Sequence, residues 1–239
     1  MTNQDYKNAA LAALKGKWAP AVLAAIIYTL LIIPYICIAE LPLFAQAGGF
    51  TLPSWFKFLL LGGVAYMWLF FYPLANGYVV AHRELLVKGD DRLTGNMFHL
   101  TFSHWLRFFV GYLLMVVKIL LWMFVLIIPG FVKAFAYALT PFLLVDCPEL
   151  SPLQCIKLSD RMMKGHKFDL FYLFLSFLGW LLLGLLTLGI GYFWLMPYME
   201  TSVAAFYEDV KAQYRAGLAA QPADHQPTQP AEQPAETTE

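Results

Sequence analysis

The stretch LFYLFLSFLGWLLLGLLTLGIGYFWLMPYM, residues 170–199, has thirty residues and not one charged side chain. A transmembrane helix needs about 20 predominantly apolar residues. The stretch is therefore too long for one crossing and slightly short for two, and Leu188–Gly191 supplies a turn between two helices. A soluble protein would need a very large core to keep it from water, whereas a bilayer does so directly. We predict that it forms a helical hairpin inside a membrane.

The composition of the whole chain indicates the same class of protein. Hydrophobic residues make up 60% of the sequence and charged residues 13%, whereas soluble globular proteins have about 25% charged residues. The net charge is zero, so no nucleic-acid partner is predicted. The three cysteines have no metal-ligand spacing, and no phosphate-binding or serine-nucleophile motif occurs. We therefore predict no cofactor, no metal site and no enzymatic activity.

Similar apolar stretches earlier in the chain extend the prediction to an all-α, polytopic membrane bundle. The apolar stretch around Ile128-Pro129-Gly130 must break there, because proline disfavours helical geometry in the residue before it and glycine tolerates a turn. The result is about six transmembrane helices in three hairpins, within a membrane domain of residues 1–216. The predicted spans are 19–39, 56–80, 108–128, 131–146, 169–188 and 191–209.

Lysine and arginine alternate between the connections of these predicted helices. They occur in the N-terminal segment, in His82–Arg107, between the fourth and fifth spans and after the sixth, but not in Glu40–Ser54 or in the two tight turns. Loops rich in lysine and arginine stay in the cytoplasm. Both termini are therefore predicted to be cytoplasmic. An uncleaved first helix fits this alternation better than a signal peptide, whose apolar region is shorter.

The last part of the chain, residues 217–239, differs from the rest in composition. It is rich in proline, glutamine, alanine and glutamate, and it has no lysine, arginine or aromatic residue. Such a segment cannot bury enough apolar surface to offset the entropy of the chain. We predict a disordered cytoplasmic tail, with docking of a partner as the alternative.

Each hairpin is predicted to follow a short cytoplasmic amphipathic helix. The three candidate segments are Ala10–Trp18, Phe98–Phe109 and Ser159–Phe168, and the first and third share a Lys-Gly step before a basic residue. Helices of this kind either lie in the headgroup layer or pack on the cytoplasmic ends of the bundle, and the sequence leaves both alternatives open.

The second crossing of each unit carries a proline, namely Pro73, Pro141 and Pro197. A proline inside a helix removes a backbone hydrogen bond and kinks the helix. These three positions are therefore predicted helix kinks.

Ionisable residues within crossings are the default candidates for a functional site in a membrane protein. Lys118 lies near the middle of the predicted third crossing and Glu200 near the middle of the sixth. Because their predicted depths are similar, we expect them to pair, with a proton or substrate site as the alternative. Lys133 is predicted near the non-cytoplasmic end of the fourth crossing.

The third unit also carries several short motifs that are similar to a known family. The motifs are Ser176–Trp180, Leu186–Gly191, Pro197-Tyr198 and Phe206–Glu208, together with Ile128–Gly130 and Met162–Gly165 in the middle of the chain. They resemble the signature of an uncharacterised bacterial integral-membrane family, domain of unknown function 975. The resemblance implies a multi-pass protein of the bacterial inner membrane, and it implies no activity.

Two classes of function stay open. The first is a non-enzymatic scaffold, accessory or envelope-maintenance protein, and the second is a small transporter or lipid-handling protein that uses the kinked repeats. A polar cavity lined by Lys118, Glu200, Asn76 and Tyr198 would favour the second class, and a dry bundle the first. The predicted partners are the lipid bilayer and other membrane proteins or a second copy of the chain; no small-molecule substrate is identified.

Overall fold

The computed structural model describes residues 1–220, which contain helices and turns but no strand. The prediction of an all-α protein is therefore confirmed. In chain order the elements are α1 (Asn3–Leu14), α2 (Trp18–Ala47), α3 (Phe56–Tyr66), the π-helix η1 (Met67–Phe71), α4 (Tyr72–Lys88), α5 (Leu93–Ser103), α6 (Trp105–Val125), α7 (Ile127–Ala136), α8 (Thr140–Asp146), α9 (Pro152–Met162), α10 (Lys167–Leu175), α11 (Leu178–Leu186) and α12 (Tyr192–Ala219).

Five helical stretches are long and apolar enough to cross a membrane. They are Trp18–Ala47, Phe56–Lys88, Trp105–Val125, Ile127–Asp146 and Lys167–Leu186. The predicted sixth span lies in α12, which is not among them, because charged residues begin at Glu200 after only eight uncharged ones, Tyr192–Met199.

The predicted tail begins inside α12, since that helix continues to Ala219. The helix therefore takes up the first three residues of the predicted range 217–239. The prediction of disorder for the rest of the tail falls almost entirely on residues 221–239, which lie outside the described residues.

A short helix precedes each hairpin, as predicted, but it ends earlier than the predicted segments do. The Lys-Gly step does not belong to the amphipathic helix. Gly16 and Gly165 have positive φ angles of 77° and 87°, a conformation that glycine adopts without steric cost. Each glycine therefore forms the turn after the short helices α1 and α9, and the sequence pattern marked the turn rather than the helix itself.

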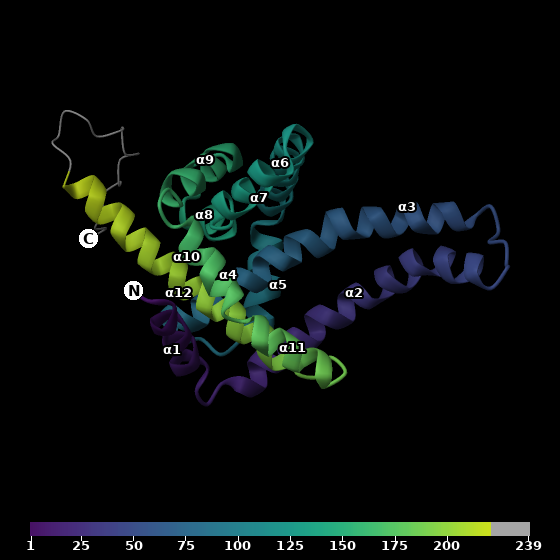
Figure 1. The fold of residues 1–239 in the computed structure, drawn as a ribbon, viewed down its shortest axis with the longest axis horizontal. Helices are drawn as coiled ribbons and strands as arrows, with labels where there is room; N and C mark the ends of the chain where they lie inside the picture. The colour runs from purple at the N-terminus through teal and green to yellow at the C-terminus, as the bar shows by residue number, and fades with distance from the viewer. Residues whose placement is uncertain (221–239) are drawn as a thin grey trace, which may run out of the picture.

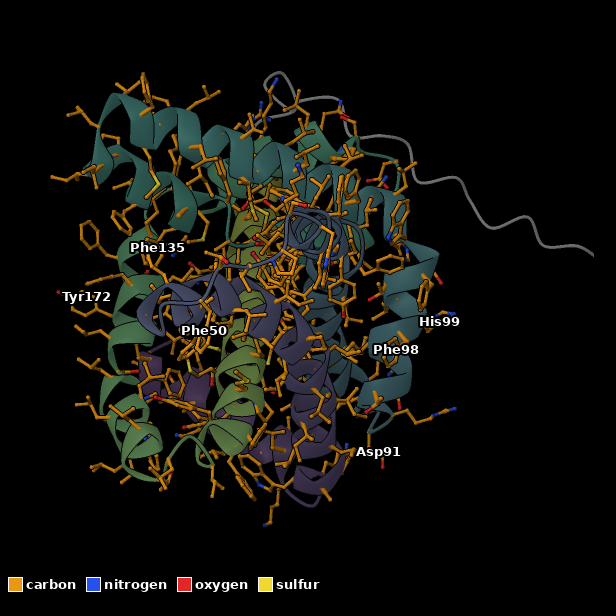
Figure 2. The ribbon with its side chains drawn as sticks, turned by 90° about the vertical axis from the view of Figure 1, so that its right-hand side faces the viewer. Phe50, Asp91, Phe98, His99, Phe135 and Tyr172 are labelled. Carbon is orange, nitrogen blue, oxygen red and sulfur yellow. The ribbon has the colours of Figure 1, made fainter. Side chains whose placement is uncertain are left out.

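The three hairpins leave the body of the protein in different directions (Figure 1). The α2–α3 hairpin reaches far from the rest of the chain, whereas α6–α7 and α11 end much closer to the body. α1 and the C-terminal end of α12 lie on the side away from the α2–α3 tip. Seen from the side of that tip, Phe135 and Tyr172 lie on one flank of the molecule, and Phe98, His99 and Asp91 lie on the other (Figure 2).

The core forms around α4, which packs against α1, α2, α5, α6, α8 and α12. α4 approaches α5 most closely at Gly77. A Cβ atom at Gly77 would lie 2.1 Å from Oγ1 of Thr101 and 2.6 Å from the carbonyl oxygen of Met97. Only glycine fits at this contact, because small residues let helix backbones approach closely.

Pro73 lies just beyond the π-helix η1, in a helical stretch that runs from Phe56 to Lys88. Proline has no N–H group, so the carbonyl of Leu69, four residues earlier, lacks its usual helical donor. The indole Nε1 of Trp105 donates a hydrogen bond to that carbonyl at 2.6 Å. A side chain from α6 thus satisfies the carbonyl that Pro73 leaves free.

We expect Trp105→Phe to lower the free energy of unfolding by about 1–3 kcal/mol, because it leaves the Leu69 carbonyl without a donor. Titration with a denaturing detergent would measure the loss. The matched control is Trp180→Phe at an exposed position. In a Pro73→Ala background the restored amide supplies a donor, so the same change at Trp105 should cost much less. An equal cost in both backgrounds would contradict the assignment.

The other two predicted kinks lie in different settings. Pro197 lies inside α12 and is buried, in an uninterrupted helix. Pro141 lies in the first turn of α8, where the missing N–H costs nothing, and a turn separates α8 from α7. The helical stretch Ile127–Asp146 is thus interrupted just before Pro141, between Ala136 and Thr140. Two further prolines inside α2, Pro34 and Pro42, did not enter the prediction.

Candidate functional site

Four charged side chains from three helices meet beside the core. Arg83 of α4 donates from Nη1 to Oδ1 of Asp146 at 2.6 Å, and from Nε to Glu208 of α12. Lys211 of α12 donates to Oδ2 of the same Asp146. We call Arg83, Asp146, Glu208 and Lys211 the Arg83 cluster.

Tyr207 holds the Arg83 cluster against the core. Its hydroxyl donates to Oδ2 of Asp146 at 2.6 Å, and its ring stacks on Phe142 with a centroid distance of 4.6 Å. The guanidinium of Arg83 and the ammonium of Lys211 lie over the same ring, at 5.3 Å and 5.4 Å. Tyr207 thus offers a hydrogen bond to the carboxylate and a π face to both cations.

The positions of these residues follow from local structure. Asp146 is the last residue of α8, and Arg83 lies in the last two turns of α4, which ends at Gly89 with a left-handed conformation. Tyr207 and Lys211 are four residues apart on α12 and so share one face of that helix. Two positive and two negative charges balance, and the side chains of Arg83 and Asp146 are only 15% and 12% exposed. The cluster can therefore lock α4, α8 and α12 together without a free charge.

The two residues that flank Tyr207 and Glu208 bind α12 to the N-terminal helix. The hydroxyl of Tyr6 in α1 donates to Oδ2 of Asp209 at 2.6 Å. The ring of Tyr6 packs edge-on against Phe206, with centroids 5.4 Å apart. All four residues of the segment Phe206–Asp209 therefore contact another helix.

Arg107 of α6 fixes the loop that follows Asp146. Its guanidinium donates to four backbone carbonyls, those of Leu144, Cys147, Pro148 and Leu150, at 2.9–3.1 Å. The last carbonyls of a helix have no partner within the helix, so a basic side chain at this end satisfies them. Arg107 thereby holds the end of α8 where Asp146 meets Arg83.

A second ion pair joins α7 to α9. Nζ of Lys133 donates to Oδ2 of Asp160 at 2.8 Å, and Lys167 lies 3.6 Å from the other carboxylate oxygen. Burial raises the pKa of Asp160, but the hydrogen bond and charge of Lys133, together with Lys167, outweigh it and hold the pKa below its ordinary value of 3.8. Lys133 therefore pairs with a charged residue of α9, a partner that its predicted place near the end of a crossing did not indicate.

We expect the contribution of Asp160 to stability to disappear in acid. A carboxyl group with a lowered pKa in the folded state stabilises the protein above its unfolded pKa and loses that effect as pH falls through the folded pKa. The difference in stability between the natural chain and Asp160→Asn should be constant from about pH 7 to 5 and should shrink below about pH 4. Detergent-unfolding midpoints between pH 7 and 3 would measure it. Exposed Asp91, changed to Asn, is the control; a difference that does not vary with pH would contradict the role of the charge.

The predicted pair of Lys118 and Glu200 does not form among the described residues. α6, which carries Lys118, packs against α4, α5, α7, α8 and α9, whereas α12 packs against α1, α2, α4, α9, α10 and α11. Similar predicted depth did not bring the two charges together, because α6 and α12 share α4 and α9 as neighbours but do not pack extensively against each other. Nζ of Lys118 lies 5.9 Å from the ring centroid of Tyr137 in the turn between α7 and α8.

The four residues named for a polar cavity do not line one together. Asn76 is buried and donates to the carbonyl of Tyr72 in its own helix at 2.9 Å. Tyr198 borders a cavity of about 390 Å³, and neither Lys118 nor Glu200 lines it. The lining of this cavity is mainly apolar and includes Trp18, Trp180 and Trp194.

The predictions from sequence missed the Arg83 cluster as a unit. Asp146 is the last residue of the predicted fourth span and Arg83 lies in the basic connection His82–Arg107, and neither position indicates which residue the other meets. The available signal was the position of Asp146 at the end of an apolar segment, which marks a helix end. Within residues 1–220, no three His, Cys, Asp or Glu side chains lie together as metal ligands.

Comparison with known proteins identifies one family. Residues 102–214 match the model of a family described as protein of unknown function (DUF975). The match covers a little under half of the chain, and it includes Asp146, Glu208 and Lys211 but not Arg83. No curated protein and no solved structure matches the chain. Over residues 102–214 the chain is therefore similar to this family, whose function is unknown.

Proposed function

We propose that the protein is a non-enzymatic scaffold or accessory protein of the bacterial inner membrane, with both termini in the cytoplasm. The observation that supports this role most is the Arg83 cluster. Each of its charges is taken up by another side chain of the same protein, which suits a structural lock and leaves no group free for chemistry. The divergent hairpins add a large apolar surface for neighbours in the bilayer (Figure 1).

A transport assay on the purified chain tests this proposal against the transporter alternative. The protein is reconstituted into sealed vesicles that contain a pH-sensitive or ion-sensitive dye. A scaffold gives the same leak rate as protein-free vesicles. Flux above that rate, lost in Glu200→Gln and kept in Glu84→Gln at a surface ion pair, would contradict the scaffold role and support transport.

Photo-crosslinking tests the scaffold role directly. A photoreactive amino acid is placed at exposed positions of the α2–α3 hairpin, such as Leu30 and Phe58. A scaffold should give discrete protein adducts, either with a second copy or with another membrane protein. Adducts with lipid alone at every exposed position of this hairpin would overturn the proposal.

The apolar cavity favours lipid handling as a second candidate function. Its volume of about 390 Å³ and its three tryptophans suit a hydrocarbon chain, and it lies between α1, α11, α12 and the start of α2. Native mass spectrometry in mild detergent should then show one retained lipid per chain. Leu183→Trp, which would fill the cavity, should remove it, whereas Leu185→Trp, at an exposed position of the same helix, should not.

A further inference from the structure

The charged helix α9 lies against the middle of α6. This contact limits how deeply the α6–α7 hairpin can enter a membrane. Ile156 of α9 is buried with Ala136 and Tyr137, and Leu114, Met115 and Ile119 of α6 pack on this small cluster. The hydroxyl of Ser159 donates to the carbonyl of Ala136 at 2.8 Å. The contacts between α9 and α6 thus extend from Arg107, near the start of α6, to Ile119 in its second half.

The outer face of α9 is too polar for hydrocarbon. Gln154, Lys157 and Arg161 are exposed on this face, and Lys164 follows directly after the helix. A lysine or arginine at the centre of a bilayer costs at least about 2.5 kcal/mol. α9 must therefore lie in water or among lipid headgroups. Because the middle of α6 packs against α9, it lies at the same depth relative to the membrane.

The ion pair between Lys133 and Asp160 gives a second, independent estimate of how deeply the α6–α7 hairpin can enter the membrane. Lys133 is bound to Asp160 of α9, and its ammonium lies 5.5 Å from the ring of Trp122 in α6. Ile127, the first residue of α7, is six residues from Lys133. At 1.5 Å per residue the hairpin reaches only about 9 Å beyond the ion pair, whereas the hydrocarbon core is about 30 Å thick.

The part of the α6–α7 hairpin that extends beyond the Lys133–Asp160 ion pair is apolar, and its side chains are exposed. Met123–Val132 contains no charged residue, and Phe124 and Ile128 are 93% and 78% exposed. The first hairpin is different, because α2 has 22 residues between Trp18 and Glu40, a length of about 33 Å. That length matches a full crossing, and the α2–α3 hairpin is also the one that reaches far from the body in Figure 1.

We infer that the α6–α7 hairpin does not cross the bilayer: its tip, Met123–Val132, dips into the hydrocarbon of the one leaflet that faces α9. Lys133, bound to Asp160 of α9, marks the base of the tip at the depth of the lipid phosphates. The α2–α3 hairpin, by contrast, is long enough to reach the opposite surface. The inference concerns the membrane contact alone, and it holds whether the protein is a scaffold or a transporter.

Cysteine labelling of the full chain in sealed vesicles of phosphatidylethanolamine and phosphatidylglycerol tests this arrangement. Cys37 and Cys147 are first changed to serine, and buried Cys155 is kept. Single cysteines are then introduced as Leu126→Cys or Ile128→Cys at the tip, Thr51→Cys at the α2–α3 tip and Lys157→Cys on α9. All four positions are exposed, so these changes leave the core intact.

An impermeant maleimide should label positions 51 and 157 from opposite sides of the membrane, and it should not label position 126 or 128 from the side of position 51. A spin label at 126 or 128 should report a depth on the α9 side of the bilayer midplane. Reaction of either tip position from the side of position 51, or a depth beyond the midplane, would overturn the inference. Labelling of 51 and 157 from the same side, or no reaction of 51 from the side opposite to 157, would overturn it as well.

Discussion

Replacing Asp146 with alanine is expected to lower the free energy of unfolding by about 3–5 kcal/mol, because it removes one partner of a partly buried ion pair. Arg83 would keep only Glu208, Lys211 would lose its carboxylate, and the hydroxyl of Tyr207 would lose its acceptor. The midpoint of unfolding in a denaturing-detergent titration, with the protein in mild detergent, measures the loss.

Glu84→Ala is the matched control, since it also removes a carboxylate from an ion pair. Its partner Lys88 is 65% exposed and one helical turn away, so the expected cost is about 0.3–0.5 kcal/mol. Adding Lys211→Met to Asp146→Ala should recover part of the loss, because it removes the one cation left without a carboxylate. If Asp146→Ala costs no more than Glu84→Ala, the Arg83 cluster does not hold these helices together.

Adding a single methyl group at Gly77 should be nearly as damaging, with an expected loss of about 1–3 kcal/mol. The new Cβ would meet Thr101 at 2.1 Å and the backbone of Met97 at 2.6 Å, and the backbone cannot rotate away as a side chain can. α4 and α5 would have to separate along their whole contact. The gain in helix propensity of Gly77→Ala, at most about 1 kcal/mol, offsets only part of this strain.

Gly62→Ala serves as the comparison for Gly77→Ala. Gly62 also lies inside a helix, but a Cβ there would have no neighbour within 4 Å, so the change should be neutral or slightly stabilising. Combining Gly77→Ala with Thr101→Ala should rescue only part of the stability, because the Met97 carbonyl stays in place. Full rescue by Thr101→Ala would show that the hydroxyl alone, and not the backbone approach, makes glycine necessary.

The helices could be predicted from the sequence because a bilayer imposes a length of apolar residues on every crossing. The ranges predicted for the first and second spans start within a residue of α2 and α3. α2 ends later than predicted, at Ala47, and the helical stretch that α3 begins continues past the predicted end to Lys88. The relative placement of the helices could not be predicted in the same way. Lys118 and Glu200 were paired by depth alone, and depth does not say which neighbours surround a helix.

The partner of Lys133 shows a second limit of hydropathy. The position of Lys133 after the Pro129-Gly130 turn placed it near the far membrane surface, on the assumption that both arms of the hairpin cross completely. Its bond to Asp160 depends on α9, whose position against α6 is set by Ile156 and Ser159. No local pattern in the sequence reports that tertiary contact, so the candidate site appears only when the helices are assembled.

The spacing of the Arg83 cluster along the chain also constrains the biogenesis of the protein. Arg83 is synthesised 63 residues before Asp146 and 125 residues before Glu208. At about 5–20 residues per second, α4 must wait roughly 6–25 s for its last carboxylate partner. Until Asp146 is synthesised the Arg83 end of α4 has an uncompensated cation, which keeps it at the membrane surface. The first hairpin can therefore insert early, but α4 can take its final place only when the ribosome has delivered α12.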